Sequence, residues 1–212
     1  MKFVIVTGGT PPSKQLLASH IKDADTLIGV DGAADVLCGY GELADVLIGD
    51  FDTATEQSVR IQQEKGAKVL RLASEKNETD TQAAVDYAIK NGASHIIMLG
   101  ALGTRIDHTQ SNIMLLLRAH AANVDAKIID ENNELLVCND SITLSGTPGQ
   151  TISILPLTGN VTVTATDLYY PLNNLLLEFG TSRGISNVMT SDTTQITVKG
   201  AYALIIIANA DE

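Results

Sequence analysis

The chain has little positive charge, two cysteines and no apolar run of membrane-spanning length. Its 14 basic residues against 25 acidic residues give a net charge of −11. That charge argues against nucleic acid as a main partner, because a phosphate backbone needs a basic surface. Cys38 and Cys138 lie far apart in sequence without metal-ligand spacing, so both are expected to be reduced thiols.

Two further absences concern the location of the protein. The apolar segment 203–210 is too short to cross a membrane and ends in polar residues. Met1 and Lys2 lead directly into a strand-like run without a secretion signal. We therefore expect a cytoplasmic protein with no membrane or nucleic-acid partner, although a nucleotide remains compatible because a bound metal can neutralise its charge.

Residues 1–126 alternate between short apolar segments and amphipathic segments. The apolar segments have hydrophobic residues on both faces, which is typical of parallel strands covered by helices. Strands are expected at 3–7, 26–30, 46–49, 67–72 and 95–99, and helices at 14–21, 55–66, 80–92 and 108–123. This alternation predicts a Rossmann-like parallel α/β domain over residues 1–126.

Residues 127–212 have a different pattern, in which segments rich in Thr, Val and Ile are separated by turn residues. Strands are expected at 135–139, 141–145, 151–157, 160–168, 174–179, 195–200 and 202–208. The short, regular spacing predicts an antiparallel β-sandwich domain, with a barrel as the alternative. The boundary between the two domains is expected within 127–134, where Asn132 and Asn133 interrupt apolar runs.

The segment 45–53, DVLIGDFDT, places two carboxylates at the end of a buried strand. Asp50 and Asp52 are two residues apart, so in an extended segment their side chains point the same way. Asp31, Asp80 and Asp107 lie in loops after other strand candidates. Because these loops share one edge of a parallel sheet, we expect the five carboxylates to converge. A solvated acidic turn would explain one Asp-x-Asp, but a repelling cluster predicts Mg²⁺ carrying a phosphate.

The loop after the strand at 95–99 adds groups that favour anions. Gly100 and Gly103 precede Arg105, and glycine-rich backbone amides near a helix start bind phosphate. Each feature also has a simpler explanation. The glycines could only shape a turn, and Thr79 or Asp80 could only cap the helix at 80–92.

Two motifs point to other enzyme classes. The string 50–53, DFDT, matches the nucleophile motif of haloacid-dehalogenase-like phosphatases, but it follows the third strand candidate where those enzymes use the first. A Mg²⁺-dependent phosphatase with Asp50 as nucleophile therefore stays as an alternative. The string 180–184, GTSRG, matches a serine nucleophile elbow, which requires a following helix. The following residues are β-like, so we reject a serine hydrolase.

Four segments together resemble thiamine pyrophosphokinase in order and spacing: 49–53, 75–85, 100–116 and 180–189. The resemblance covers nearly the whole chain. It implies transfer of the pyrophosphoryl group of ATP to the hydroxyl of thiamine, with release of AMP. It also implies a catalytic, ATP- and Mg²⁺-binding domain (1–126), a thiamine-binding domain (127–212), and a homodimer with each site between one subunit's α/β domain and the partner's β domain.

The resemblance further implies roles for individual residues. The catalytic residues would be Asp50, Asp52, Asp80 and Asp107, with Asp50, Asp52 and Asp80 as Mg²⁺ ligands. The ATP-binding residues would be Asp31, Lys76, Thr79, Gly100, Gly103 and Arg105, and the thiamine-binding residues Ser186 and Asn187. Asp80 is also a candidate to accept the hydroxyl proton.

The sequence departs from the family pattern at three positions. Asn77 stands where the family often has Asp, Thr53 replaces the more usual Ser, and Val188 stands where an acidic residue is common. The neutral Asn77 is the one hint of a non-enzyme alternative, a thiamine- or nucleotide-binding regulator with an inactive site. The five retained aspartates argue against it, because a binding module has little need for such mutual repulsion.

Overall fold

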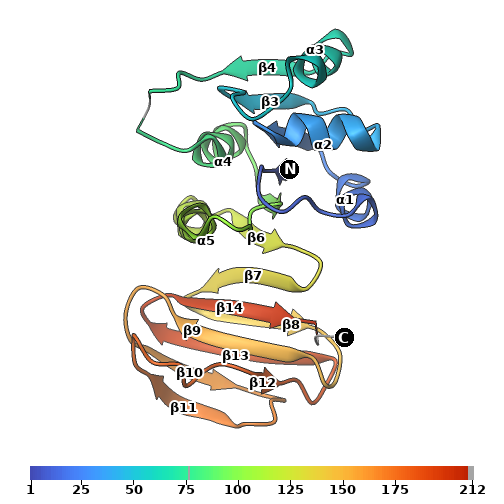
Figure 1. Ribbon diagram of the computed structural model, residues 1–212. Helices are drawn as coiled ribbons and strands as arrows, with labels where there is room; N and C mark the ends of the chain where they lie inside the picture. The colour runs from blue at the N-terminus through green and yellow to red at the C-terminus, as the bar shows by residue number, and fades with distance from the viewer. Residues whose placement is uncertain (76, 210–212) are drawn as a thin grey trace. The chain divides into compact units, whose positions relative to one another are not determined.

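The computed structural model describes residues 1–75 and 77–209. The chain divides into two compact units, Met1–Glu131 and Asn132–Glu212 (Figure 1). The first contains all of the described helices, and the second contains strands joined by turns. Within the described residues, no helix combines the length and the hydropathy needed to span a bilayer.

The first unit is a parallel sheet with helices on both faces. Its strands are β1 (Lys2–Val6), β2 (Thr26–Val30), β3 (Val46–Gly49), β4 (Lys68–Arg71), β5 (His95–Leu99) and β6 (Asp125–Ile129). Their order across the sheet is β6-β5-β1-β2-β3-β4, and every neighbouring pair is parallel. The predicted α/β fold of this half is confirmed.

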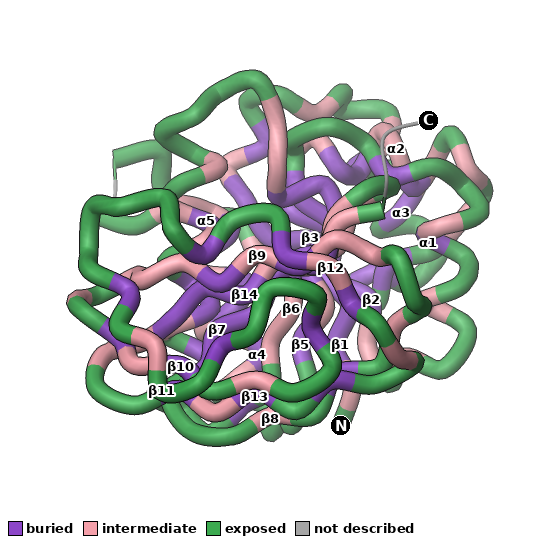
Figure 2. The backbone as a smooth tube through the Cα atoms, turned by 90° about the horizontal axis from the view of Figure 1, so that it is seen from below, coloured by how far each residue is buried: buried purple, intermediate pink, exposed green. Residues whose placement is uncertain are grey.

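Five helices cover this sheet: α1 (Lys14–Ile21), α2 (Ala33–Tyr40), α3 (Glu56–Glu64), α4 (Asp80–Lys90) and α5 (Ile106–Ala121). Figure 1 shows α1, α2 and α3 on one face and α4 and α5 on the other. Strands β1, β2, β3 and β5 are largely buried between these layers, as Figure 2 shows, whereas β4 has no buried residue. Ser13, Thr55 and Thr79 cap α1, α3 and α4 through their side-chain oxygens.

Two elements of this unit were not predicted. Helix α2 is only eight residues long, and Gly32 at its N-cap offers no side-chain hydrogen bond. Strand β6 carries Asp125 and Lys127 among its five residues, and it is defined by parallel pairing with β5 rather than by an apolar run. Because β6 belongs to the first sheet, the first unit ends at Glu131, which lies within the expected boundary segment 127–134 and beyond the expected domain limit at residue 126.

The second unit consists of two antiparallel sheets. The strands are β7 (Asn133–Cys138), β8 (Ser141–Ser145), β9 (Thr151–Pro156), β10 (Val161–Ala165), β11 (Leu172–Leu177), β12 (Asn187–Val188), β13 (Thr193–Gly200) and β14 (Ala203–Ala208). One sheet has the order β12-β9-β14-β7 and the other β11-β10-β13-β8. Side chains from both sheets, such as Ile154, Ile205 and Val198, share one apolar core. The unit is therefore the expected sandwich, and the two-residue strand β12 is the element that the sequence pattern did not reveal.

Candidate active site

Three carboxylates meet at the carboxyl edge of the parallel sheet. Asp31 follows β2, and Asp50 and Asp52 follow β3, its parallel neighbour. Each offers a carboxylate oxygen, and these oxygens lie within 4.8 Å of one another. The main-chain amide of Asp31 donates to the Ile48 carbonyl at 3.0 Å, which holds the two strand ends together. The sheet therefore brings together three of the five aspartates that the sequence placed at this edge.

Asp50 and Asp52 do not lie on an extended segment, so the reason given for their convergence was wrong. Phe51, which separates them, has a left-handed backbone with φ 61°, and the Asp52 amide donates to Asp50 Oδ1 at 3.2 Å. Asp31 is also left-handed, with φ 50°. Left-handed residues other than glycine are strained and occur frequently at functional sites. Tight turns, rather than strand alternation, orient this group.

The pKa of the Asp31 carboxyl group is raised above its ordinary value. Burial raises its pKa, and the charges of Asp52, Asp80 and Asp50 raise it further. The Thr53 hydroxyl opposes this by donating to Asp31 Oδ2 at 2.7 Å. The other oxygen, Oδ1, is buried and accepts no hydrogen bond. A buried carboxylate oxygen without a donor, facing two further carboxylates, fits a hard cation such as Mg²⁺.

Asp80 lies near this group but outside it. It is the first residue of α4 and is half-buried, and its charge acts on Asp31. Thr79 caps the same helix, because its Oγ1 accepts from the Gln82 amide at 3.1 Å. The capping explanation for Thr79 therefore holds, and it leaves the hydroxyl proton of Thr79 available as a donor.

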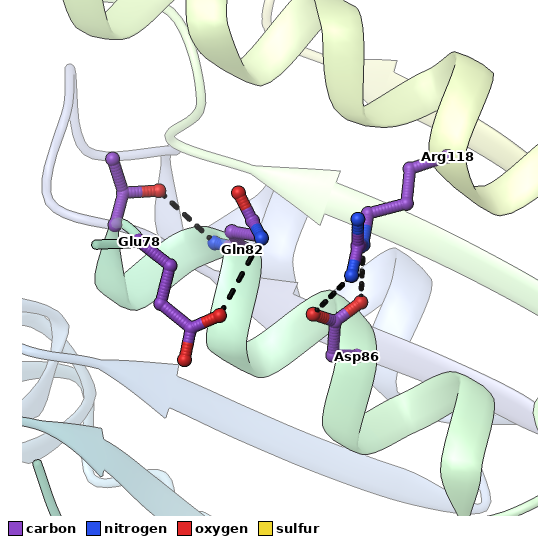
Figure 3. A network of polar contacts seen from close by, with 5 residues as sticks. Glu78, Gln82, Asp86 and Arg118 are labelled. Atoms are coloured by element: carbon purple, nitrogen blue, oxygen red, sulfur yellow. Dashed lines mark hydrogen bonds and ion pairs between the residues drawn. The ribbon is translucent and has the colours of Figure 1, made fainter. Parts of the chain in front are cut away.

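Helix α4 is fixed to α5 by a bidentate ion pair. Arg118 of α5 holds both carboxylate oxygens of Asp86, with Nη2 at 2.8 Å from Oδ2 (Figure 3). One turn earlier on α4, the Gln82 amide group donates to Glu78 at 3.4 Å. This network lies along the two helices whose first turns carry Asp80 and Asp107. The ion pair joins the middle of α4 to the last turn of α5, so it fixes the two helices to each other away from Asp80 and Asp107.

Arg105 and Asp107 bind each other. The guanidinium donates to Asp107 through Nη2 at 2.7 Å and Nε at 3.3 Å, and both side chains are exposed. The hydrogen bond from Arg105 holds the pKa of Asp107 below its ordinary value. Asp107 lies outside the three-carboxylate group.

The glycines of the 100–103 loop allow two loops to approach closely. The Gly9 amide donates to the Gly100 carbonyl at 2.8 Å, and the Thr10 amide donates to Leu102 at 2.8 Å. A Cβ atom on Gly9 would lie 2.3 Å from the Gly100 oxygen, so no larger residue fits there. The Gly103 amide donates to Thr109 Oγ1 of α5 at 3.1 Å, so this amide already has an acceptor within the protein. The remaining candidate, Lys76, lies outside the described residues.

The predicted thiamine-binding residues lie in the second unit, in and just before β12. Ser186 is exposed, has φ 57°, and its amide donates to Ser153 Oγ at 3.0 Å. Asn187 is 5% exposed, and its side chain bonds the amide and the carbonyl of Tyr170 at 3.0 and 2.8 Å. Its role is therefore to position Tyr170.

Two features close to the predicted site residues were not expected from the sequence: a hydrogen bond to Asp31 and an exposed pair of tyrosines. Thr53, which the sequence marks only as a departure from the family pattern, donates a hydrogen bond to Asp31. Tyr169 and Tyr170 are 67% and 59% exposed, and their rings stand edge to face with centroids 5.0 Å apart. Only 4% of the residues are aromatic, so two adjacent tyrosines are the sequence feature that could have predicted this aromatic surface.

Comparison with known proteins gives matches along the whole chain. The family model "Thiamin pyrophosphokinase, catalytic domain" matches residues 17–128, and "Thiamin pyrophosphokinase, vitamin B1 binding domain" matches 139–203. The curated "Thiamine pyrophosphokinase" of Bacillus subtilis (strain 168) is 31% identical over 200 residues, which cover 88% of this chain and 89% of that protein.

Solved structures extend this likeness to the fold. Thiamine pyrophosphokinase from Bacillus subtilis has a TM-score of 0.89 at 25% identity, over 100% of both chains. Thiamin pyrophosphokinase from Geobacillus thermodenitrificans has a TM-score of 0.86 at 28% identity, over 100% of this chain and 99% of that one. Both units therefore have counterparts in these structures.

Proposed function

Because the chain belongs to the thiamin pyrophosphokinase family, we propose that it transfers the pyrophosphoryl group of ATP to the hydroxyl of thiamine. The products are thiamine diphosphate and AMP. The observation that carries this proposal is the presence of both family domains, in order, on one chain. The matches do not favour the phosphatase or the inactive regulator, because the similar proteins are named as pyrophosphokinases.

We propose that Asp31, Asp50 and Asp52 hold Mg²⁺ at the edge of the parallel sheet. Support comes from their oxygens within 4.8 Å of one another and from the buried, unbonded Oδ1 of Asp31. Mg²⁺ prefers such carboxylates together with substrate phosphates, and when bound it neutralises phosphate charge. Asp80 stays a proposed ligand and a proposed acceptor of the hydroxyl proton, supported by its electrostatic effect on Asp31.

The ATP phosphates are assigned to groups near the same edge. Thr79, with its hydroxyl proton available beside Asp80, is proposed as a donor to a phosphate oxygen. Arg105 and Asp107 are proposed to belong to the phosphate site as one ion pair, because the guanidinium donates to the carboxylate. Gly100 and Gly103 support the site through the shape of their loop, and the assignment of Lys76 to phosphate rests on the resemblance alone.

Thiamine is assigned to the second unit. Ser186 is exposed and offers a hydroxyl, and Asn187 presents the exposed Tyr170. Aromatic faces attract cations, so Tyr169 and Tyr170 suit the cationic thiazolium ring. The net charge of −11 also favours a cationic substrate. The homodimer and the cytoplasmic location stay predictions, and the dimer can be checked by native mass spectrometry.

The direct test is a product assay with ATP, Mg²⁺ and thiamine, in which AMP, ADP and phosphate are separated by chromatography. Thiamine-dependent AMP, matched by thiamine diphosphate and lost with EDTA, is the expected result. Phosphate released without thiamine would favour the phosphatase. Binding of thiamine or ATP without turnover would favour the regulator.

A further inference from the structure

An arginine that the sequence analysis did not single out lies beside the carboxylate group. Arg71 is the last residue of β4, and it is in register with Gly49, directly before Asp50. Its guanidinium carbon lies 5.2 Å from the centroid of the Phe51 ring. Phe51 separates Asp50 from Asp52 in the chain, so the guanidinium lies over the ring of the residue between these two members of the group.

The Phe51 ring is a firm support for that charge. It is 9% exposed and belongs to the apolar core of the first unit. The left-handed turn at Phe51 turns the ring into the core while the flanking residues carry the carboxylates. A cation–π contact with the ring does not consume the N–H donors of a guanidinium.

Among residues 1–75 and 77–209, the Phe51 ring is the one partner of the Arg71 side chain. Within the described part of the chain it makes no hydrogen bond and no ion pair, and it is exposed to solvent. Arg105 and Arg118, by contrast, are each bonded to a carboxylate through two nitrogens. Arg71 is therefore a cation held over Phe51 at this edge of the sheet, and among the described residues its hydrogen-bond donors have no acceptor.

We propose that Arg71 binds a phosphate beyond the one attached to the nucleoside, in the polyphosphate whose metal is held by Asp31, Asp50 and Asp52. This inference rests on the proposed function, which supplies a polyphosphate substrate. A planar guanidinium can donate two parallel hydrogen bonds to one phosphate, which a lysine ammonium cannot reproduce. The register of β4 against β3 puts Arg71 opposite Gly49, at the strand end from which Asp50 and Asp52 follow, so it is placed to reach the phosphates bound to the metal.

The test is calorimetric binding to the full chain, with α,β-methylene-ATP and Mg²⁺, inorganic tripolyphosphate and Mg²⁺, AMP, and Mn²⁺ alone as probes. Arg71→Met should weaken binding of both polyphosphates at least about tenfold, the cost of losing a charge-assisted hydrogen bond. Its affinity for AMP and for Mn²⁺ alone should not fall. Arg71→Lys should give an intermediate loss. The matched control is Arg60→Met, which removes an exposed arginine paired with Glu64 on α3 and should bind like the wild type.

Three results would overturn the proposal. Arg71→Met could bind the polyphosphates as tightly as the wild type. It could lose Mn²⁺ affinity in proportion, which would show that Arg71 only supports the carboxylate turn. It could also lose AMP affinity equally, which would place the contact at the phosphate next to the nucleoside. If Arg71→Met does not fold, the several-fold loss expected for Arg71→Lys decides the question by the same criteria.

Failure of the proposed function is distinguishable from failure of the Arg71 assignment. A wild-type protein that makes no AMP from ATP and thiamine would contradict the proposed function. Tripolyphosphate binding that depends on Arg71 would still support the phosphate contact in that case, because this probe contains neither nucleoside nor thiamine.

Discussion

Replacing Asp31 with asparagine should stabilise the metal-free protein and weaken its response to Mg²⁺. Asp31 carries its charge within 4.8 Å of the oxygens of Asp50 and Asp52. Asparagine removes that charge, keeps an oxygen for the hydrogen bond from Thr53, and tolerates the left-handed backbone at φ 50°. Its amide can also donate toward the neighbouring carboxylates.

Coulomb's law sets the size of the effect. Two unit charges 4.8 Å apart repel each other by about 0.9 kcal/mol in water and by about 3.5 kcal/mol at an effective dielectric constant of about 20. Asp52 is exposed, and Asp31 and Asp50 are half-buried, so the lower end applies. We expect the free energy of unfolding in EDTA to rise by about 1 kcal/mol, or roughly 2–4 °C in melting temperature.

The assay is thermal unfolding in EDTA and in increasing Mg²⁺. The wild type should gain stability from Mg²⁺, and Asp31→Asn should gain less. Asp35→Asn is the control, because Asp35 lies outside the metal group and accepts hydrogen bonds from the amide and hydroxyl of Thr55. It should melt lower in EDTA and keep its Mg²⁺ response. An Asp31→Asn variant that melts below the wild type in EDTA and keeps the full Mg²⁺ response would refute the reasoning.

Three further predictions concern pH, turnover and the second unit. The raised pKa of Asp31 means that its share of stability is present at low pH and lost as pH rises through the folded-state pKa. The advantage of Asp31→Asn in EDTA should therefore shrink on acidification, as melting curves at successive pH values will show. Asp50→Ala or Asp52→Ala should abolish metal-dependent turnover while the circular dichroism spectrum stays native; wild-type rates would contradict the metal assignment. Asn187→Ala should cost about 2 kcal/mol in urea unfolding, because it leaves the Tyr170 amide without its acceptor; an unchanged midpoint would argue against this positioning role.

The central strands β1, β2, β3 and β5 of the parallel sheet were predictable because they are apolar on both faces. Strands β2, β3 and β5 and helix α1 have the bounds expected from the sequence. Helix α2 and strand β6 were missed because their residues carry a weak local signal. One lacks a side-chain cap, and the other is defined by pairing with β5. Contacts distant in sequence, rather than local propensity, create such elements.

The candidate site, like the fold, was predictable from the sequence only in part. The sequence placed Asp31, Asp50 and Asp52 at one edge because the ends of parallel strands share that edge. The sequence did not predict the left-handed backbone of Phe51. A phenylalanine shortly after the glycine that ends a strand does not by itself indicate such a turn. The position of Arg71 depends on the register of β4 against β3, which is a property of the folded sheet.

The central claim is that the β and γ phosphates of ATP move together to thiamine. The most direct measurement uses ATP labelled at its β phosphorus, with phosphorus NMR or mass spectrometry of the separated products. The label is expected in thiamine diphosphate, and AMP is expected to be unlabelled. Label in ADP, together with thiamine monophosphate, would show transfer of a single phosphoryl group and would contradict it.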